Sequence, residues 1–344
     1  MKQRRRILLL CNGTEQQTTG RLFTEMAKRL SAQHQVELHL RSFPQGMLRK
    51  IIPLLTTEVR NCRRILSSDI IIAHSALSLS LLSMLWAKLL RRKIIALIWD
   101  FYPASTRVAR NITNPVLLWA YSMVEGTAYR LADIIYVPTS DYAAYEALDG
   151  YRNVRQLPLW PCDALRSPSG DMPVTDAIHL AFAGQINAIR SLDKAVTTAL
   201  SSNRGKLILH LFSQDGAPDA LAKLAAVEDN LEIRHHGFVD PSALQDMLGR
   251  MDFGLIPIDV DFQLPAFPSK ALTYLAAGLP IIYDGPAMPG LESVLDEYKI
   301  GMTLLQFSHM SGEELKGWRT DFLDRRDRYM ASIDQKWQSF AEIL

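Results

Sequence analysis

The sequence predicts an α/β protein made of two doubly wound, Rossmann-like domains. Short apolar runs of strand length alternate with helical segments along the whole chain, which is typical of parallel sheets covered on both faces. The alternation is interrupted at residues 163–176, where Pro, Ser and Gly predict a linker, and then starts again. The length of 344 residues also favours two domains, because single cores rarely grow past about 250–300 residues.

The first domain is expected to span residues 1–162 and to contain five strands and four helices. Thr19 is expected to cap the first helix, because its hydroxyl can accept a bond from a free amide. The strands are expected at 6–11, 36–41, 69–73, 94–99 and 133–138. The helices are expected at 19–33, 77–90, 116–131 and 141–148.

The second domain is expected to span residues 177–317. The pair Asp240-Pro241 predicts a helix start, since proline is favoured at the first helical position. Residues 318–344 carry aromatic side chains at helical spacing and are expected to pack back toward the N-terminal domain. The strands are expected at 178–183, 206–212, 231–235, 253–258, 281–283 and 301–305. The helices are expected at 191–201, 218–227, 241–251, 269–277 and 291–298.

Charge is divided unevenly along the chain, although the formal net charge is only +2. Residues 1–160 hold 22 Lys and Arg against 11 Asp and Glu, a net charge of +11. The N-terminal half is therefore expected to meet an anionic partner: nucleic acid, an anionic membrane surface or a phosphorylated acceptor. No recognisable nucleic-acid-reading motif accompanies the charge, which disfavours the first of these.

The sequence predicts a cytoplasmic protein. Three cysteines without C-x-x-C spacing are typical of free thiols in a reducing compartment. The apolar run at 7–11 is too short for the core of a signal peptide, and no segment has the roughly 18 apolar residues of a membrane span.

An anion site is predicted where the expected helix 269–277 begins. Ser269 occupies the N-cap position, and Gly278 lies where the helix must stop. Lys270 falls in the first turn, so that free helix amides and one cation together suit a diphosphate. Thr273 and Tyr274 share the helix face of Lys270 and are expected beside the phosphates, where a ribose would lie.

Four segments together resemble the B-fold glycosyltransferases, most closely family 4 and relatives that build bacterial surface polysaccharides. The resemblance implies two domains facing each other across a cleft, with Gly184, Gln185, Arg190 and Phe238 at the donor. Gln185 stands where the family has Arg, and Arg190 stands in for its Lys. The four segments are 99–103, 183–192, 236–239 and 267–280.

The sequence departs from the family pattern at the donor sugar. Many members have two Glu residues seven positions apart, and here Pro265 and Thr273 occupy their places. The Glu that would contact the donor sugar is absent, so the pattern does not settle a retaining outcome. The Pro-Ser-Lys form at 268–270 is similar to a glucuronosyl-type branch thought to invert with an Asp base.

The acceptor side is expected at strand ends in the first domain. Asp100 would accept the proton of the acceptor hydroxyl or orient that hydroxyl, and the alternative is an ordinary turn or cap. His74 ends another strand and is ranked below Asp100, because lone histidines are more often structural. Tyr102 lies in the turn after Asp100. Gly13 and Thr14 belong to a loop that lacks G-x-G-x-x-G and suits a flexible acceptor-side loop.

No metal or cofactor is expected. Asp259 and Asp261 lie two apart after a strand, as in the Asp-x-Asp sites of the other major glycosyltransferase fold. In a chain of B type, solvated loop carboxylates are the better interpretation. No Gly-rich turn of the right form follows Cys11 or Ala183, which disfavours a nicotinamide-dependent oxidoreductase.

Two segments of the basic half, 47–67 and 85–93, interleave basic and apolar residues. This pattern suits a peripheral helix on an anionic leaflet, and the alternative is a buried helix with a solvated basic face.

Together the sequence predicts a membrane-surface glycosyltransferase that passes a sugar from a nucleoside-diphosphate donor, UDP before other bases, to a polyprenyl-diphosphate-linked saccharide. Two alternatives stay open. One is an inverting enzyme for an acidic sugar with an Asp base. The other is a non-catalytic, membrane-associated partner subunit with a degenerate donor site.

Overall fold

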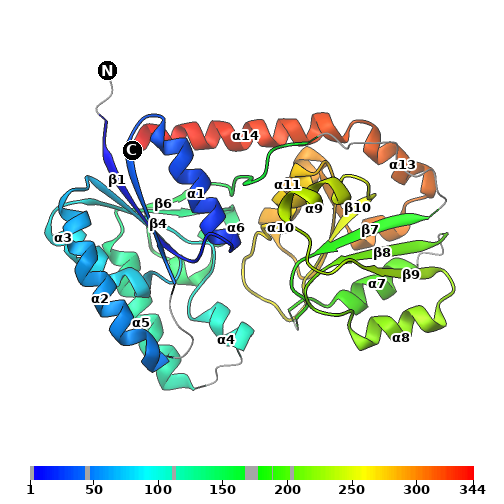
Figure 1. Cartoon of the computed structure of the whole chain (residues 1–344), viewed down its shortest axis with the longest axis horizontal. Helices are drawn as coiled ribbons and strands as arrows, with labels where there is room; N and C mark the ends of the chain where they lie inside the picture. Colours follow the sequence, from blue (N-terminus) through cyan, green and yellow to red (C-terminus); the bar gives the residue numbers. More distant parts are fainter. Residues whose placement is uncertain (1–3, 43–46, 111–113, 167–176, 188, 202–204) are drawn as a thin grey trace. The chain divides into compact units, whose positions relative to one another are not determined.

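The computed structural model describes residues 4–42, 47–110, 114–166, 177–187, 189–201 and 205–344. The chain divides into two compact units. The N-terminal unit comprises Met1–Cys162, Leu264–Ala266 and Ile333–Leu344, and the C-terminal unit comprises Asp163–Gln263 and Phe267–Ser332. Each unit contains a six-stranded parallel sheet with helices on its faces (Figure 1).

The sheet of the N-terminal unit has the strand order β2-β1-β3-β4-β5-β6. The order reverses between β1 and β3, and ligands of open α/β sheets bind outside the carboxyl ends of the strands at such a switch point. Every residue of β3 is buried, which explains its uninterrupted apolar sequence. The strands are β1 (Arg6–Asn12), β2 (Gln35–Arg41), β3 (Ile70–His74), β4 (Lys93–Leu97), β5 (Ile134–Val137) and β6 (Val154–Gln156).

Helices α2, α3 and α5 lie side by side on one face of this sheet (Figure 1). The first helix begins one residue earlier than expected: Gln17 is its N-cap, so the predicted capping role of Thr19 is wrong. The helices are α1 (Thr18–Ser31), α2 (Met47–Leu66), the 3-10 turn η1 (Leu77–Ser80), α3 (Leu81–Leu89), α4 (Ala104–Arg110), α5 (Pro115–Leu131), α6 (Ser140–Ala143) and η2 (Glu146–Leu148).

The long helix α14 (Phe322–Ile343) ends on the N-terminal unit. The ring of Trp337 lies 4.8 Å from that of Trp160, and Phe340 lies 5.0 Å from Tyr136. Lys93 Nζ donates a hydrogen bond of 2.7 Å to the carbonyl of Ile343. The aromatic spacing of the last residues therefore serves packing.

The sheet of the C-terminal unit has the order β12-β11-β10-β7-β8-β9, with its switch point between β7 and β10. The Asp240 side chain caps α9 by accepting from the amides of Ser242 and Ala243 at 3.0 and 3.3 Å, as the Asp-Pro pair predicts. The strands are β7 (Ile178–Ala183), β8 (Leu207–Phe212), β9 (Leu231–His235), β10 (Phe253–Pro257), β11 (Ile281–Asp284) and β12 (Gly301–Thr303). The helices are α7 (Leu192–Leu200), α8 (Asp219–Val227), α9 (Pro241–Leu248), α10 (Lys270–Ala276), α11 (Pro289–Tyr298), α12 (Leu304–His309) and α13 (Gly312–Thr320).

Four of the described elements were not expected from the sequence: β6, α4, α12 and α13. β6 is a half-exposed edge strand without an apolar run, and α4 lies in a segment for which no helix was predicted. The expected strand 301–305 ends at Thr303 because this residue forms a capping box with Gln306 and so begins α12.

Candidate functional site

Lys270 and Gly184 lie together at the switch point of the C-terminal sheet. Lys270 begins α10, and its Nζ lies 4.5 Å from the centre of the Phe182 ring on β7. A Cβ added to Gly184 would come within 2.2 Å of that Nζ, and Gly184 has φ +133°. Only glycine suits this backbone conformation and leaves room for the ammonium group.

Arg190 joins this pair from the loop after β7. Its Nη1 donates to the carbonyl of Pro257 at 3.4 Å, and the Asp259 amide donates to the Ile189 carbonyl at 2.8 Å. These bonds tie the loop after β7 to the loop after β10. The structure thus brings together Gly184, Arg190 and Lys270, which lie as much as 86 residues apart in the chain.

The two cations are electrostatically unsatisfied. Burial and, to a smaller extent, the nearby Arg190 charge together lower the pKa of Lys270 to about 7, although part of the Lys270 side chain still reaches solvent. Burial also lowers the pKa of Arg190. Among the described residues, no carboxylate forms an ion pair with either side chain. Two desolvated cations without a carboxylate are typical of a site that binds an anion.

Asp259 has a structural part in this site that the sequence did not reveal. Its carboxylate accepts from the Ser191 hydroxyl, from Lys194 Nζ at 3.3 Å and from the Asp261 amide at 3.0 Å. It therefore fastens the β10 loop to the start of α7. Within the described part of the chain, no group of three or more His, Cys, Asp or Glu residues is arranged to hold a metal ion.

Tyr274 does not contact a ribose, and this prediction is corrected. The residue is 0% exposed, and its hydroxyl accepts from the Ala183 amide at 2.9 Å and donates to the Leu255 carbonyl at 3.2 Å. Its ring fills the space that Gly254 leaves open. Tyr274 thus joins β7 to β10 beneath the cations. Thr273 on the same helix is half-buried and keeps its predicted place near Lys270.

Ser269 also differs from its prediction. It occupies the N-cap position of α10, but its backbone is αR and its hydroxyl does not cap the helix. The helix has only seven residues, so its dipole is a weaker source of positive potential than that of a longer helix. The side chains of Lys270 and Arg190, rather than the helix end, supply the positive charge.

The remaining predicted donor residues lie at the surface. Gln185 is exposed beside Gly184, and Phe238 is 73% exposed after β9. Strand β9 is the edge strand, two strands from β7, and this corresponds to a separation of about 10 Å. The described contacts do not join Phe238 to the Lys270 group.

A row of three histidines supports the loop that carries Phe238. His210 Nδ1 lies 2.9 Å from His236 Nε2, and His210 Nε2 lies 3.0 Å from His179 Nδ1. Burial and, to a smaller extent, the neighbouring imidazoles together lower the pKa of His210 to about 4. Sequence reasoning missed this row, because its members lie on three different strands or strand ends.

On the N-terminal unit, the predicted acceptor residues follow β1, β3 and β4. The loop with Gly13 and Thr14 is held by hydrogen bonds within the loop itself. The Thr14 amide donates to Gln17 Oε1, and the Gln17 amide donates to the Thr14 carbonyl, both at 3.0 Å. A Cβ on Gly20 would lie 2.0 Å from the Thr14 carbonyl oxygen. Gly20 therefore lets α1 approach this loop, a role that the sequence did not reveal.

His74 is buried rather than available to an acceptor, which corrects its prediction. It is 6% exposed, and its ring lies 4.6 Å from that of Trp99 and 5.6 Å from that of Phe23. Neither ring nitrogen has a hydrogen-bond partner among the residues that the structure describes, and burial lowers the pKa of His74 to about 3. His74 is thus a neutral member of an aromatic cluster.

Asp100 is accessible to solvent, yet desolvation by the surrounding protein raises the pKa of its carboxyl. Its amide and that of Trp99 both donate to the Ser75 hydroxyl, at 3.1 and 2.7 Å. The ring of Tyr102 lies 6.3 Å from that of Tyr121. Asp100 is thus an exposed carboxylate among the predicted acceptor residues.

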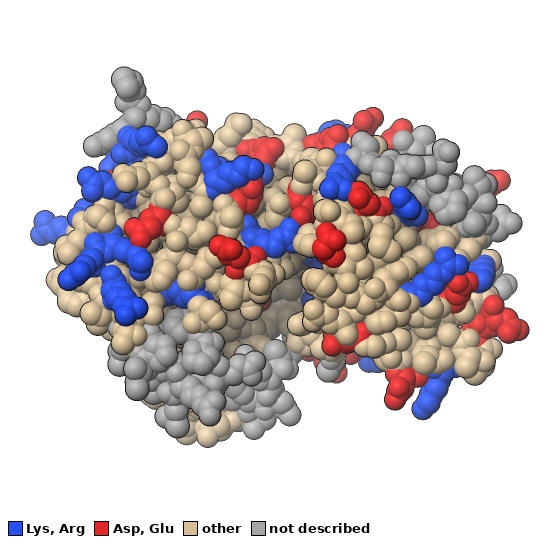
Figure 2. Space-filling view, viewed as in Figure 1, with Lys and Arg blue, Asp and Glu red and all other residues tan. Residues whose placement is uncertain are grey.

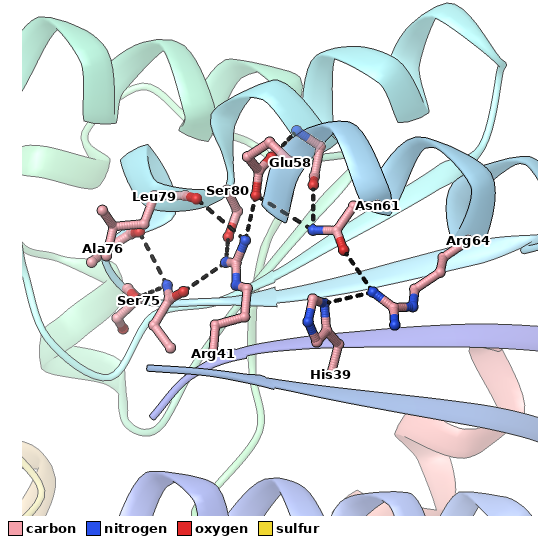
Figure 3. Close-up of polar contacts among 11 residues, drawn as sticks. His39, Arg41, Glu58, Asn61, Arg64, Ser75, Ala76, Leu79 and Ser80 are labelled. Carbon is pink, nitrogen blue, oxygen red and sulfur yellow. Dashed lines mark hydrogen bonds and ion pairs between the residues drawn. The ribbon is translucent and has the colours of Figure 1, made fainter. Parts of the chain in front are cut away.

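A polar network that the sequence did not predict joins the ends of β1 and β2 to α2, η1 and α3. Arg41 and Glu58 form an ion pair of 2.5 Å with side chains 1% and 2% exposed (Figure 3). Arg41 also donates to Asn12 Oδ1 at 2.6 Å and to the Ser80 hydroxyl. Glu58 accepts from the Ser83 amide at 2.6 Å.

Helices α2, α3 and α5 expose apolar side chains at the surface of the N-terminal unit. Val59 and Leu66 are exposed on α2 and Leu89 on α3, while Val116 and Trp119 are exposed on α5. On the face drawn in Figure 2, Lys and Arg predominate over the N-terminal unit. The helices of the described chain include none that is long and apolar enough to cross a membrane. The expected basic segment 47–67 lies partly outside the residues whose side chains are described.

The fold is shared with solved glycosyltransferase structures. The lipopolysaccharide outer core galactosyltransferase WaaB, in its apo form, is similar with a TM-score of 0.65 and 11% identity, over 97% of this chain and 99% of that chain. UGT2 of Phytolacca americana, complexed with UDP-2-fluoro-glucose and pterostilbene, is similar with a TM-score of 0.52 and 10% identity, over 100% of both chains. The kitacinnamycin glycotransferase is similar with a TM-score of 0.51 and 12% identity, over 98% and 99%.

These likenesses confirm the predicted fold: the chain has the glycosyltransferase B fold, with two Rossmann-like units. No protein-family model matches the sequence, and no curated protein matches it. At 10–12% identity the likeness establishes the fold alone.

Proposed function

We propose that the protein is a glycosyltransferase that takes a sugar from a nucleoside-diphosphate donor held by the C-terminal unit. The observation that carries the proposal is the pair of desolvated cations, Lys270 and Arg190, beside Gly184 at the switch point of a Rossmann-like sheet. A diphosphate supplies the negative charge that these cations lack. UDP is the favoured nucleotide, on the resemblance of the donor segments to family 4 enzymes.

The same cations suit the chemistry of transfer. As the bond between the anomeric carbon and the diphosphate oxygen breaks, negative charge grows on the leaving diphosphate, and fixed cations stabilise that charge. The acceptor oxygen forms the new bond to the anomeric carbon. Its proton passes to the carboxylate of Asp100, which is exposed at the end of the segment after β4. The transfer is expected to need no metal.

The acceptor is proposed to be a polyprenyl-diphosphate-linked saccharide in bacterial surface polysaccharide assembly. The basic N-terminal half and the exposed apolar side chains of α2, α3 and α5 support a site on the inner face of an anionic membrane. The chain would then be cytoplasmic and peripheral. Flotation with vesicles of phosphatidylglycerol, but not of phosphatidylcholine alone, tests this attachment.

Calorimetric titration with UDP, GDP and ADP, with and without magnesium, tests the donor site. Saturable binding of one nucleoside diphosphate in the presence of EDTA is expected. If none of the three binds, the proposed donor site is wrong, and a non-catalytic partner subunit becomes the better interpretation. In a chain that does bind, Asp100→Asn should leave nucleotide affinity unchanged and lower transfer. Unchanged transfer would remove Asp100 from the reaction.

Asp100 also bears on the second candidate, an inverting enzyme for an acidic sugar. No Glu stands at the position of Thr273, and an exposed Asp with a raised pKa is available as a base. The anomeric configuration of the product, determined by NMR, separates inversion from retention.

A further inference from the structure

The segment after β3 is held by side chains from three other elements: Asn12 on β1, Arg41 on β2 and Glu125 on α5. Asn12 Nδ2 donates to the carbonyls of Ser75 and Ala76, each at 3.3 Å. Arg41 Nη1 donates to the Leu79 carbonyl at 3.3 Å (Figure 3). Glu125 on α5 accepts from the amides of Leu77 and Ser78 at 2.9 and 2.8 Å. Consecutive backbone groups of residues 75–79 are thus fixed from several directions.

Holding the segment in this way costs free energy of folding. A buried ion pair such as Arg41–Glu58 contributes little to stability compared with apolar residues of similar size, because both charges lose their hydration. Ala76 has φ +60°, a left-handed conformation that is unfavourable for a residue with a Cβ. Such conformations persist where the surroundings over-determine them, and they concentrate at functional sites.

Ser75, the first residue of this segment, is hydrogen-bonded to the main chain of Asp100. The hydroxyl of Ser75, which is buried, accepts the amide hydrogens of both Trp99 and Asp100. The same hydroxyl donates to the Leu97 carbonyl at 3.4 Å. Side-chain contacts therefore run from Arg41 through Asn12 to the Ser75 backbone, and from the Ser75 hydroxyl to the main chain that carries the Asp100 carboxylate.

We propose that Ser75 is a positioning residue that sets the main chain of Asp100, and that Asn12 and Arg41 hold Ser75 in place for this purpose. The proposal rests on the proposed role of Asp100 at the acceptor. The competing explanation is that the network serves folding alone, in which case the position and titration of Asp100 do not depend on the Ser75 hydroxyl.

Ser75→Ala and Ser83→Ala form a matched pair that separates the two explanations. Ser83 is also fully buried, and its hydroxyl accepts from Asn61 Nδ2 at 3.1 Å without touching Trp99 or Asp100. Each variant removes one buried hydroxyl of the same network, so both are expected to lower the melting temperature by similar amounts.

Two readouts are expected to change in Ser75→Ala only. Hydrogen exchange of a peptide covering residues 98–103, followed by mass spectrometry, should become at least tenfold faster. The carboxyl 13C titration of Asp100, assigned with Asp100→Asn, should move to lower pH, because a released Asp100 reaches more water and its raised pKa returns toward the usual range.

Equal behaviour of the two variants in both readouts would overturn the proposal. If Ser75→Ala does not fold, Asn12→Ser provides the second variant, since Asn12 is only partly buried and also supports the Ser75 carbonyl. It should shift the Asp100 titration in the same direction by a smaller amount, and an unchanged titration would overturn the proposal. Neither readout uses a nucleotide or an acceptor, so failure of the proposed function in the nucleotide titration is a separate result.

Discussion

Both units place an arginine or lysine at the switch point of a parallel sheet, but only one of them pairs it. Arg41, in the N-terminal unit, meets Glu58, Asn12 and Ser80. Lys270 and Arg190, in the C-terminal unit, meet each other and carbonyl or aromatic groups, without a carboxylate from the described chain. The difference teaches that a buried cation indicates a ligand site only when the protein itself leaves its charge unbalanced.

The two switch points therefore differ in what their polar side chains do. At the N-terminal switch point, internal side chains satisfy the polar groups, so that this edge holds a loop in place. At the C-terminal switch point, Gly184 has no side chain, so the Lys270 ammonium group lies next to the Gly184 backbone. We therefore expect substitutions at the first to change stability and substitutions at the second to change binding.

The largest expected effect comes from breaking the paired cation. Glu58→Gln leaves Arg41 buried without a countercharge and should destabilise the N-terminal unit by about 3–5 kcal/mol. Urea denaturation followed by tryptophan fluorescence measures this loss. UDP affinity, measured under conditions where the variant is folded, should stay unchanged. The double variant Arg41→Met with Glu58→Leu should recover much of the stability, because it removes both charges together.

The unpaired cation should behave in the opposite way. Lys270→Ala is expected to weaken binding of a nucleoside diphosphate about 10- to 100-fold, since charge-assisted hydrogen bonds contribute about 1.5–3 kcal/mol. The melting temperature of the free protein should not fall, because a desolvated charge is removed. Calorimetry with UDP measures the first effect. Tyr274→Phe is the control for the same helix, and it should keep UDP affinity while lowering stability.

Protonation of Lys270 should also make UDP affinity depend on pH. Because the free Lys270 has a pKa of about 7, it is largely neutral at pH 8.5 and must take up a proton to meet a diphosphate. UDP affinity should therefore fall as pH rises above about 7. Titrations in buffers of different ionisation enthalpy should show proton uptake at pH 8.5, and a pH-independent affinity between 6.5 and 8.5 would contradict the lowered pKa of Lys270.

The smallest expected effect concerns the histidine row. The folded pKa of His210, about 4, lies below the unfolded value of about 6.5, so the unfolded state binds a proton first as the pH falls. The contribution of neutral His210 to stability is complete above pH 6.5 and is lost between about 6.5 and 4. Between pH 7 and 5 the C-terminal unit should lose about 1–2 kcal/mol. His210→Gln should flatten this slope in thermal melts, whereas exposed His235→Gln should not.

The sequence by itself determined the positions of most strands, the two-unit architecture and the short segments that contain Gly184, Arg190 and Lys270. Apolar runs of strand length report burial directly, and the donor residues Gly184, Arg190 and Lys270 belong to short local segments with turn and cap signals. The fold could therefore be predicted in outline, as could the three residues that the structure brings together. The edge strand β6 was missed because a half-exposed strand has no apolar run.

Only the tertiary structure decided which polar side chains are satisfied internally. The sequence places Tyr274 on the helix face of Lys270. In the structure its ring packs against Gly254, and its hydroxyl is hydrogen-bonded to β7 and β10. His74 ends a strand as a site residue would, but Trp99 and Phe23 enclose it. The polar network of the N-terminal unit draws on residues far apart in the sequence, and no local sequence signal marks any of them: Asn12, Arg41, Glu58 and Ser75. Their network exists only because parallel strands bring distant strand ends to one edge of the sheet, a juxtaposition that no local pattern encodes.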